Sequence, residues 1–191
     1  MRTLLRSSLW GAALGVLVLT GNAPAGAQTG KPMPAWDQKL RCPTEAACTR
    51  FVVLTDFGSA AVLDRETGLV WERSPDPATL DWVQAHSNCN ANGTTFPRPG
   101  GRLGWRLPTI QELNSLVEPG QTDPALPPGH PFLNVKSDVS EPEYWSATTS
   151  TQFPNTAWGT SFFNGSTGGV FPKSNAMHVW CVRGGQGVDP Q

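Results

Sequence analysis

Apolar residues recur every three positions between Ile110 and Leu116, which is the spacing of one face of an α-helix. Thr109 stands directly before this run, and Glu112 follows it three positions later, as in a capping box. Pro108 disfavours helical backbone at the residue that precedes it. The pattern therefore predicts a short helix that has Thr109 as its N-cap, follows a sharp corner and buries one apolar face.

Arg106 lies between two large apolar residues, Trp105 and Leu107, just before this helix. An arginine in this setting either points to solvent or pairs with a carboxylate inside the protein. We favour the pair because a buried charge needs a partner and Glu112 is close in the sequence. In either case we assign Arg106 a structural role.

A second, earlier helix is predicted after Thr79, which is a suitable N-cap residue. Asp81 would lie in its first turn, where the helix dipole favours negative charge. Trp82, Ala85 and Cys89 then fall on one helical face. We expect this helix to bury a tryptophan and to direct a cysteine inward.

Short runs rich in β-branched and aromatic residues predict strands in the rest of the chain. They lie at residues 51–54, 61–63, 69–71, 144–148, 157–163, 169–171 and 179–183. The connector 64–68 ends in a glycine and predicts a hairpin with a bulged loop. It lacks the acidic spacing of a calcium-binding loop, so we expect a solvated turn.

The segment 118–143 contains six prolines and no helix or strand pattern. A segment of this length inside a compact domain is usually functional or mobile. Because proline fixes φ, we expect an ordered excursion, with Phe132 holding its middle against the body of the protein.

The elements follow one another as short strands, two helices, a long irregular segment and a final run of strands. This order predicts an α+β domain, in which two helices pack on small antiparallel sheets with long ordered loops. We expect residues 51–185 to form this domain and residues 186–191 to form a frayed tail.

Residues 1–27 have the pattern of a signal peptide. Arg2 and Arg6 precede an apolar run, and the A-x-A sequence at 25–27 is a cleavage signal. The run is shorter than the roughly 20 residues of a membrane span, so we favour cleavage over an uncleaved anchor. We therefore expect an exported protein (periplasmic, cell-surface or secreted) with no membrane span in the mature chain and an extended lead-in at 28–50.

Charge is sparse, with a formal net charge of −1, so the composition offers no basic field for nucleic acid. The chain also contains 20 glycines, 18 prolines and 8 tryptophans. This composition indicates a loop-rich domain whose core depends on a few large aromatic side chains.

Four cysteines, Cys42, Cys48, Cys89 and Cys181, follow the signal peptide. In an exported chain they suggest two disulfides, for which three pairings are available. We favour Cys42–Cys48, which closes a small loop, and Cys89–Cys181. Closing the long second loop restricts the unfolded chain most, by about 4 kcal/mol. A metal site is less favoured because no C-x-x-C or nearby histidine cluster occurs.

Five segments carry a resemblance to a known family. They are Asp64–Trp71, Trp82–Cys89, Gly104–Leu113, Tyr144–Thr148 and Cys181–Gly185. In this order they resemble the Lcl C-terminal domain family, which is found at the end of a bacterial collagen-like adhesin and in many exported proteins. The motif residues, to which we assign structural roles, are Trp105, Arg106, Thr109, Glu112 and Trp145.

The resemblance implies a C-type-lectin-like fold, in which both chain ends meet in one sheet. A long disulfide from the first helix to the last strand is typical of that fold and corresponds here to Cys89 and Cys181. The calcium and sugar motifs of true lectins do not occur, so calcium-dependent sugar binding is not implied. The sequence also has no collagen-like Gly-X-Y repeat, so a trimer is not implied and the oligomeric state stays open.

Common catalytic motifs are absent from the sequence. It contains no G-x-S-x-G, H-E-x-x-H, P-loop or Rossmann glycine pattern, and its three histidines are scattered. We therefore predict no catalytic residues, no cofactor and no metal. An exported enzyme of unknown type, with a site assembled in space, stays an alternative.

The export signal, the loop-rich composition and the resemblance together predict a non-catalytic binding module for a glycan or protein ligand. A structural subunit of an envelope assembly is a further alternative, for which an exposed apolar patch would be the sign. The candidate contact residues come from the long segment and from the late hairpin: His130, Phe163, Asn164, Lys173, Asn175 and His178.

Overall fold

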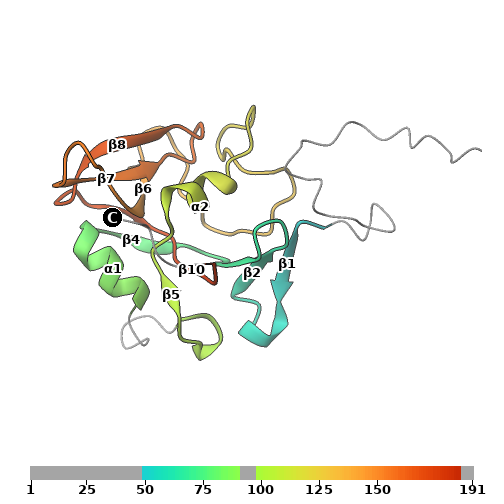
Figure 1. Ribbon diagram of the computed structural model, residues 1–191. Helices are drawn as coiled ribbons and strands as arrows, with labels where there is room; N and C mark the ends of the chain where they lie inside the picture. Colours follow the sequence, from blue (N-terminus) through green and yellow to red (C-terminus); the bar gives the residue numbers. More distant parts are fainter. Residues whose placement is uncertain (1–48, 91–97, 186–191) are drawn as a thin grey trace, which may run out of the picture. The chain divides into compact units, whose positions relative to one another are not determined.

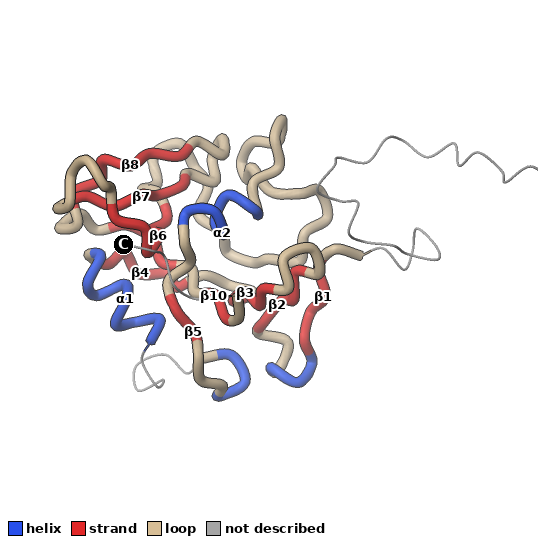
Figure 2. The backbone as a smooth tube through the Cα atoms, viewed as in Figure 1, coloured by secondary structure: helices blue, strands red, loops and turns tan. Residues whose placement is uncertain are grey.

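The computed structural model describes residues 49–90 and 98–185. The predicted signal peptide, residues 28–48 of the predicted lead-in with Cys42 and Cys48, and the predicted C-terminal tail lie outside these residues. Within them the chain is α+β, with most of its regular structure in two five-stranded sheets and two α-helices (Figures 1 and 2). No helix of the described part is long and apolar enough to cross a membrane.

The first sheet holds both ends of the described chain. Its strands are β1 (Phe51–Leu54), β2 (Ala61–Asp64), β3 (Leu69–Glu72), β10 (Val182–Arg183) and β5 (Trp105–Arg106), in this spatial order. Neighbouring strands are antiparallel throughout. The last strand, β10, therefore lies between β3 and β5 and ties the end of the domain to its beginning.

The second sheet contains the late strands together with one early strand. Its spatial order is β4 (Asp76–Leu80), β9 (Met177–Val179), β6 (Tyr144–Thr149), β7 (Thr156–Thr160) and β8 (Thr167–Pro172). The pair β6–β9 is parallel at Tyr144 and His178, whereas the other pairs are antiparallel. The expectation of purely antiparallel sheets is thus corrected at one pair.

The helix α2 (Ile110–Ser115) begins as predicted. Thr109 Oγ1 accepts the Glu112 N–H at 3.3 Å, and Glu112 Oε2 accepts the Thr109 N–H at 2.8 Å, which completes a capping box. The same carboxylate receives two hydrogen bonds from Arg106, at 2.6 and 2.7 Å. Ile110 and Leu113 are buried beneath the helix. Arg106 is therefore paired, as expected, and it fixes the corner before α2.

The helix α1 (Trp82–Asn90) begins later than its predicted cap. Thr79 lies in β4 and pairs with His178 of β9, so it does not cap the helix. Asp81 is the cap instead: its Oδ1 accepts the Gln84 N–H at 2.8 Å, and Gln84 Oε1 accepts the Asp81 N–H. The sequence carries this signal as an acidic residue followed three positions later by glutamine.

Two further predictions near strands need correction. The hairpin between β2 and β3 is present, but its first residue, Asp64, is buried and accepts hydrogen bonds from Arg50, so this part of the turn is not solvated. The strand expected at 157–163 ends at Thr160, because Ser161–Ser166 form the turn to β8.

The closing strand expected at 179–183 is two strands in different sheets, β9 and β10. Residues 177–182 are buried without interruption, so the segment lacks the alternation that would assign it to one sheet face. Trp180 enters the core cluster that contains Val182, whereas Cys181 enters the cluster that contains Val179. The chain crosses from one sheet to the other at these two residues.

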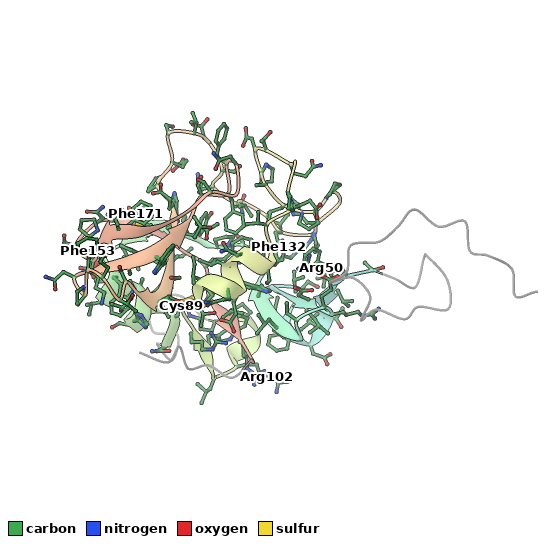
Figure 3. All side chains as sticks on the ribbon, turned by 45° about the horizontal axis from the view of Figure 1, so that its top comes forward. Arg50, Cys89, Arg102, Phe132, Phe153 and Phe171 are labelled. Atoms are coloured by element: carbon green, nitrogen blue, oxygen red, sulfur yellow. A yellow bond between two sulfur atoms is a disulfide. The ribbon has the colours of Figure 1, made fainter. Side chains whose placement is uncertain are left out.

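The disulfide Cys89–Cys181 fastens α1 to this crossing, with Cα atoms 5.5 Å apart. Cys89, which is labelled in Figure 3, is 1% exposed. The two cysteines are 92 positions apart in the sequence, so the bond closes a long loop in the unfolded chain.

We predict that C89A/C181A lowers the free energy of unfolding by about 4 kcal/mol, because the unfolded chain loses this constraint. Denaturant unfolding followed by tryptophan fluorescence measures the change. The matched control is C42A/C48A, which removes a pair that spans a short loop and should cost less. Equal stability of C89A/C181A and the natural sequence would contradict the prediction.

Candidate functional site

The six candidate contact residues do not gather at one place. His178 is 2% exposed, and its Nε2 lies 3.0 Å from Oε2 of the partly exposed Glu141. His130 is partly buried and stacks on Phe132, and burial lowers the pKa of its imidazole. Lys173 Nζ lies 4.0 Å from the Trp82 ring centre.

The other three candidates lie in turns. Asn164 and Asn175 are exposed, and Phe163 is partly buried. The Asn164 side chain accepts the Ser166 N–H at 3.0 Å within the β7–β8 turn. None of the six lines either of the two cavities described below.

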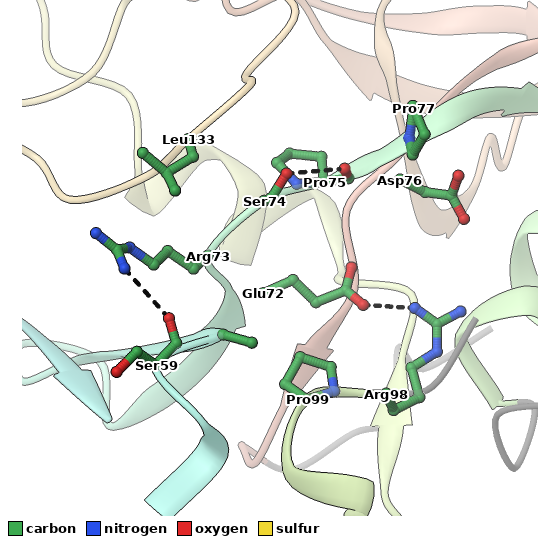
Figure 4. A pocket seen from close by; sticks show the side chains of 11 residues that line it. Ser59, Glu72, Arg73, Ser74, Pro75, Asp76, Pro77, Arg98, Pro99 and Leu133 are labelled. Carbon is green, nitrogen blue, oxygen red and sulfur yellow. Dashed lines mark hydrogen bonds and ion pairs between the residues drawn. The ribbon is translucent and has the colours of Figure 1, made fainter. Parts of the chain in front are cut away.

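The first cavity is charged. It has a volume of about 410 Å³ and lies where β3 runs into β4, beside Pro99 at the start of the 3₁₀ turn Pro99–Gly101. Its lining includes the four charged residues Glu72, Arg73, Asp76 and Arg98 (Figure 4). We call it the charged cavity.

Glu72 and Arg98 form a buried ion pair in the charged cavity. The other carboxylate oxygen of Glu72 accepts the Cys181 N–H at 3.1 Å. Arg98 also donates to the Asn88 carbonyl at the end of α1 and lies 3.2 Å from Cys181 Sγ. Burial raises the pKa of Glu72, although the Arg98 charge opposes this. The pair therefore connects α1, β3 and the chain crossing.

The remaining charges of this cavity are also bonded within the protein. Asp76 accepts from the Asn88 side chain at 2.8 Å and from the Ala78 N–H at 2.9 Å. Arg73 donates to the carbonyls of Pro131 and Ser59. Each of the four charged groups thus holds parts of the chain together, which is a structural role.

The second cavity, which we call the trough, is uncharged and larger, at about 620 Å³. It lies between α2 and the strands β7 and β8, and the end of β6 and the following loop form its wall. It is lined by Ile110, Gln111, Asn114, Thr148, Thr149, Ser150, Thr151, Pro154, Trp158 and Thr167. Seven of these ten side chains carry a hydroxyl or an amide group, and none carries a charge.

Strand alternation places Trp158 in the trough. Its neighbours in β7, Ala157 and Gly159, are buried on one sheet face, so Trp158 lies on the other face and is partly exposed. A Cβ atom at Gly169 of the adjacent strand would lie 2.4 Å from indole Cε2. One face of the indole therefore rests on the Gly169 backbone, and only glycine leaves room for it.

Asn114 reaches the trough from α2. Its Oδ1 accepts hydrogen bonds from the hydroxyls of Thr160 at 3.0 Å and Thr167 at 2.8 Å. In this arrangement Oδ1 lies against the two strands and the amide nitrogen lies away from them. Among the described residues no partner receives the Nδ2 protons, and the side chains of Gln111 and Thr151 also lack protein hydrogen bonds.

Other polar groups of the trough belong to the scaffold. Thr148 Oγ1 accepts the Ile110 N–H at 3.0 Å, and Thr149 Oγ1 accepts from Lys173 Nζ at 2.9 Å. The trough therefore combines fixed walls with a few free donors and acceptors. The sequence analysis did not predict the trough. The signal that could have indicated it is Trp158, a large aromatic residue at an outward-facing position of a strand.

Comparison with known families identifies the chain. The sequence model of the Lcl C-terminal domain matches residues 60–183, about two thirds of the chain. The chain belongs to this family. The match runs from β2 to β10 and includes the disulfide, the lining of the trough and the lining of the charged cavity except Ser59. A comparison with curated proteins found no match.

The described part of this Lcl C-terminal domain has no group of three or more His, Cys, Asp and Glu side chains that could hold a metal ion. Two of the motif residues predicted to be structural, Trp105 and Trp145, are buried. Trp145 is fully buried and its indole N–H donates to the Leu80 carbonyl at 2.9 Å, while Trp105 is 3% exposed.

We predict that E72A lowers the free energy of unfolding by about 3 kcal/mol, because it leaves the Arg98 charge buried without its carboxylate. Urea unfolding measures the loss. The control is D56A, which removes an exposed carboxylate that forms no hydrogen bond in the described residues and should change stability little. Equal losses in the two variants would show that the ion pair has no special role.

Proposed function

We propose that this chain is an exported, non-catalytic binding module that recognises a glycan or protein ligand through a surface held on a disulfide-tied scaffold. The observation that carries the proposal is the trough. It is of the size of small-molecule sites, about 300–1,000 Å³, and it presents one aromatic ring among unbonded polar groups. Membership of a family named for the C-terminal domain of an adhesin-type protein supports a binding role.

A C-type-lectin-like arrangement is part of this proposal. Its support is that β1 and β10 belong to one sheet and that Cys89–Cys181 joins the first α-helix to the segment before the last strand. In that arrangement the loops carry ligand contacts while the two sheets stay rigid.

The two alternatives have less support. An exported enzyme would need free acid and base groups, whereas the carboxylates of the charged cavity are bonded to Arg98, Asn88 and backbone N–H groups. An envelope subunit would need an apolar docking patch. Phe153 and Val170 are exposed and line one shallow hollow, which is the surface that such a role would use.

We predict that the purified chain binds members of an immobilised glycan and protein array and releases them chemically unchanged. Mass spectrometry of the recovered ligand checks the second point. Blank arrays with folded protein would contradict the binding role, and a converted ligand would favour the enzyme alternative.

We also predict that the exported protein begins at Gln28, because cleavage follows the A-x-A signal. N-terminal sequencing of protein from the periplasm, surface and medium checks this. Replacing Ala25 and Ala27 by bulky residues should block processing. A mature protein that still begins at Met1 would argue against the signal peptide.

A further inference from the structure

We propose that the trough binds a neutral saccharide, with one sugar face stacked on Trp158 and the hydroxyls bonded to the free groups of Asn114, Gln111 and Thr151. This inference rests on the proposed binding function and specifies its ligand class. Four observations lead to it.

The first observation is the absence of charge in the lining. A sulfated or carboxylated ligand would need a cation in contact with it, since an anion loses much solvation on binding. The ammonium group of Lys173 bonds to Thr149 at the edge of the trough, but it also lies over the Trp82 ring. An uncharged ligand fits the lining best.

The second observation is the mixture of donors and acceptors. The amides of Gln111 and Asn114 donate, and the hydroxyl of Thr151 both donates and accepts. A saccharide carries hydroxyls around its rim, each of which can also do both. Every free polar group of the trough therefore finds a partner in a ring of hydroxyls, whichever way each of these rotates.

The third observation is the support of Trp158. Gly169 closes one face of the indole, so the ring cannot retreat toward β8. The partly exposed ring lines the trough, where it supplies a rigid apolar surface with a negative π face. The C–H groups on one face of a sugar ring are suited to such a surface, and little conformational entropy is lost when they dock.

The fourth observation argues against an extended peptide. A peptide strand gains affinity by pairing with the backbone at a sheet edge. The edges of the second sheet are β4 and β8. Thr167 of β8 lines the trough with its hydroxyl, which bonds to Asn114, and the rest of the lining comes from β7, α2, the end of β6 and the loop after it. Its groups are side chains, which suit a ligand without backbone pairing.

The test compares the full-length exported chain with variants on an array of neutral, sulfated and sialylated glycans and of peptides, followed by calorimetry with the strongest neutral oligosaccharide. We expect binding to neutral glycans. W158A should weaken it about tenfold or more, the loss typical of a central aromatic contact. W158F should retain most of the affinity because it keeps an aromatic face.

Asn114→Asp is the sharper variant. Aspartate keeps the oxygen that accepts from Thr160 and Thr167 but replaces the free amide donor by an acceptor. We expect N114D to weaken binding while the thermal unfolding midpoint changes little. The control is L103A, which removes an exposed apolar side chain away from the trough and should leave binding unchanged.

The outcomes separate this inference from the proposed function. Binding only to anionic glycans, or glycan binding that W158A and N114D leave unchanged, would overturn the neutral-saccharide site and leave the binding module standing. Peptide binding that W158A abolishes would keep the trough as the site but overturn the ligand class. Failure of the folded chain to bind any probe would overturn both. If W158A does not fold, W158F and N114D decide.

Discussion

The rest of the structure depends on how the chain passes from one sheet to the other at Trp180 and Cys181. Glu72 holds both residues there: its carbonyl accepts the Trp180 indole N–H at 2.8 Å, and its carboxylate accepts the Cys181 N–H. Cys181 is bonded to Cys89, and Arg98 neutralises the carboxylate. A crossing between sheets would otherwise leave buried polar backbone groups without partners, which proteins avoid at a cost of about 1–3 kcal/mol for each group.

The same crossing explains how a domain with short helices can carry long loops. Trp180 contacts Phe132 of the long segment at 4.9 Å between ring centres, and Phe132 contacts Phe51 at 5.1 Å. Tyr144 accepts the Lys136 N–H at 2.7 Å and thus fixes a second point of that segment. Aromatic packing, as the sequence predicted for Phe132, orders the excursion together with the Tyr144 hydroxyl and hydrogen bonds such as that from Arg73 to the Pro131 carbonyl. The prolines reduce the entropy lost in ordering it.

The sequence predicted the features that rest on local chemistry. The capping box at Thr109, the Arg106–Glu112 pair and the β2–β3 hairpin all depend on residues within a few positions. The split of the last strand was not predictable, because uninterrupted burial hides the change of sheet. The trough was not predictable either: Asn114 and Trp158 are far apart in the sequence, and only the packing of α2 on β7 brings them to one surface.

The two cavities differ in a way that bears on how the domain uses its polar groups. In the charged cavity, Glu72, Arg98 and Asp76 are bonded to three separate parts of the chain, so a ligand could engage them only by breaking bonds that the fold requires. In the trough, the scaffold uses the oxygen of Asn114 but not its nitrogen, and the free groups of Gln111 and Thr151 support nothing else. A ligand bound in the trough, as proposed, would break no hydrogen bond of the scaffold. The domain thus uses the charges of the charged cavity to hold its own chain together. The free side chains of the trough do not support the fold, so they can be substituted without unfolding the domain.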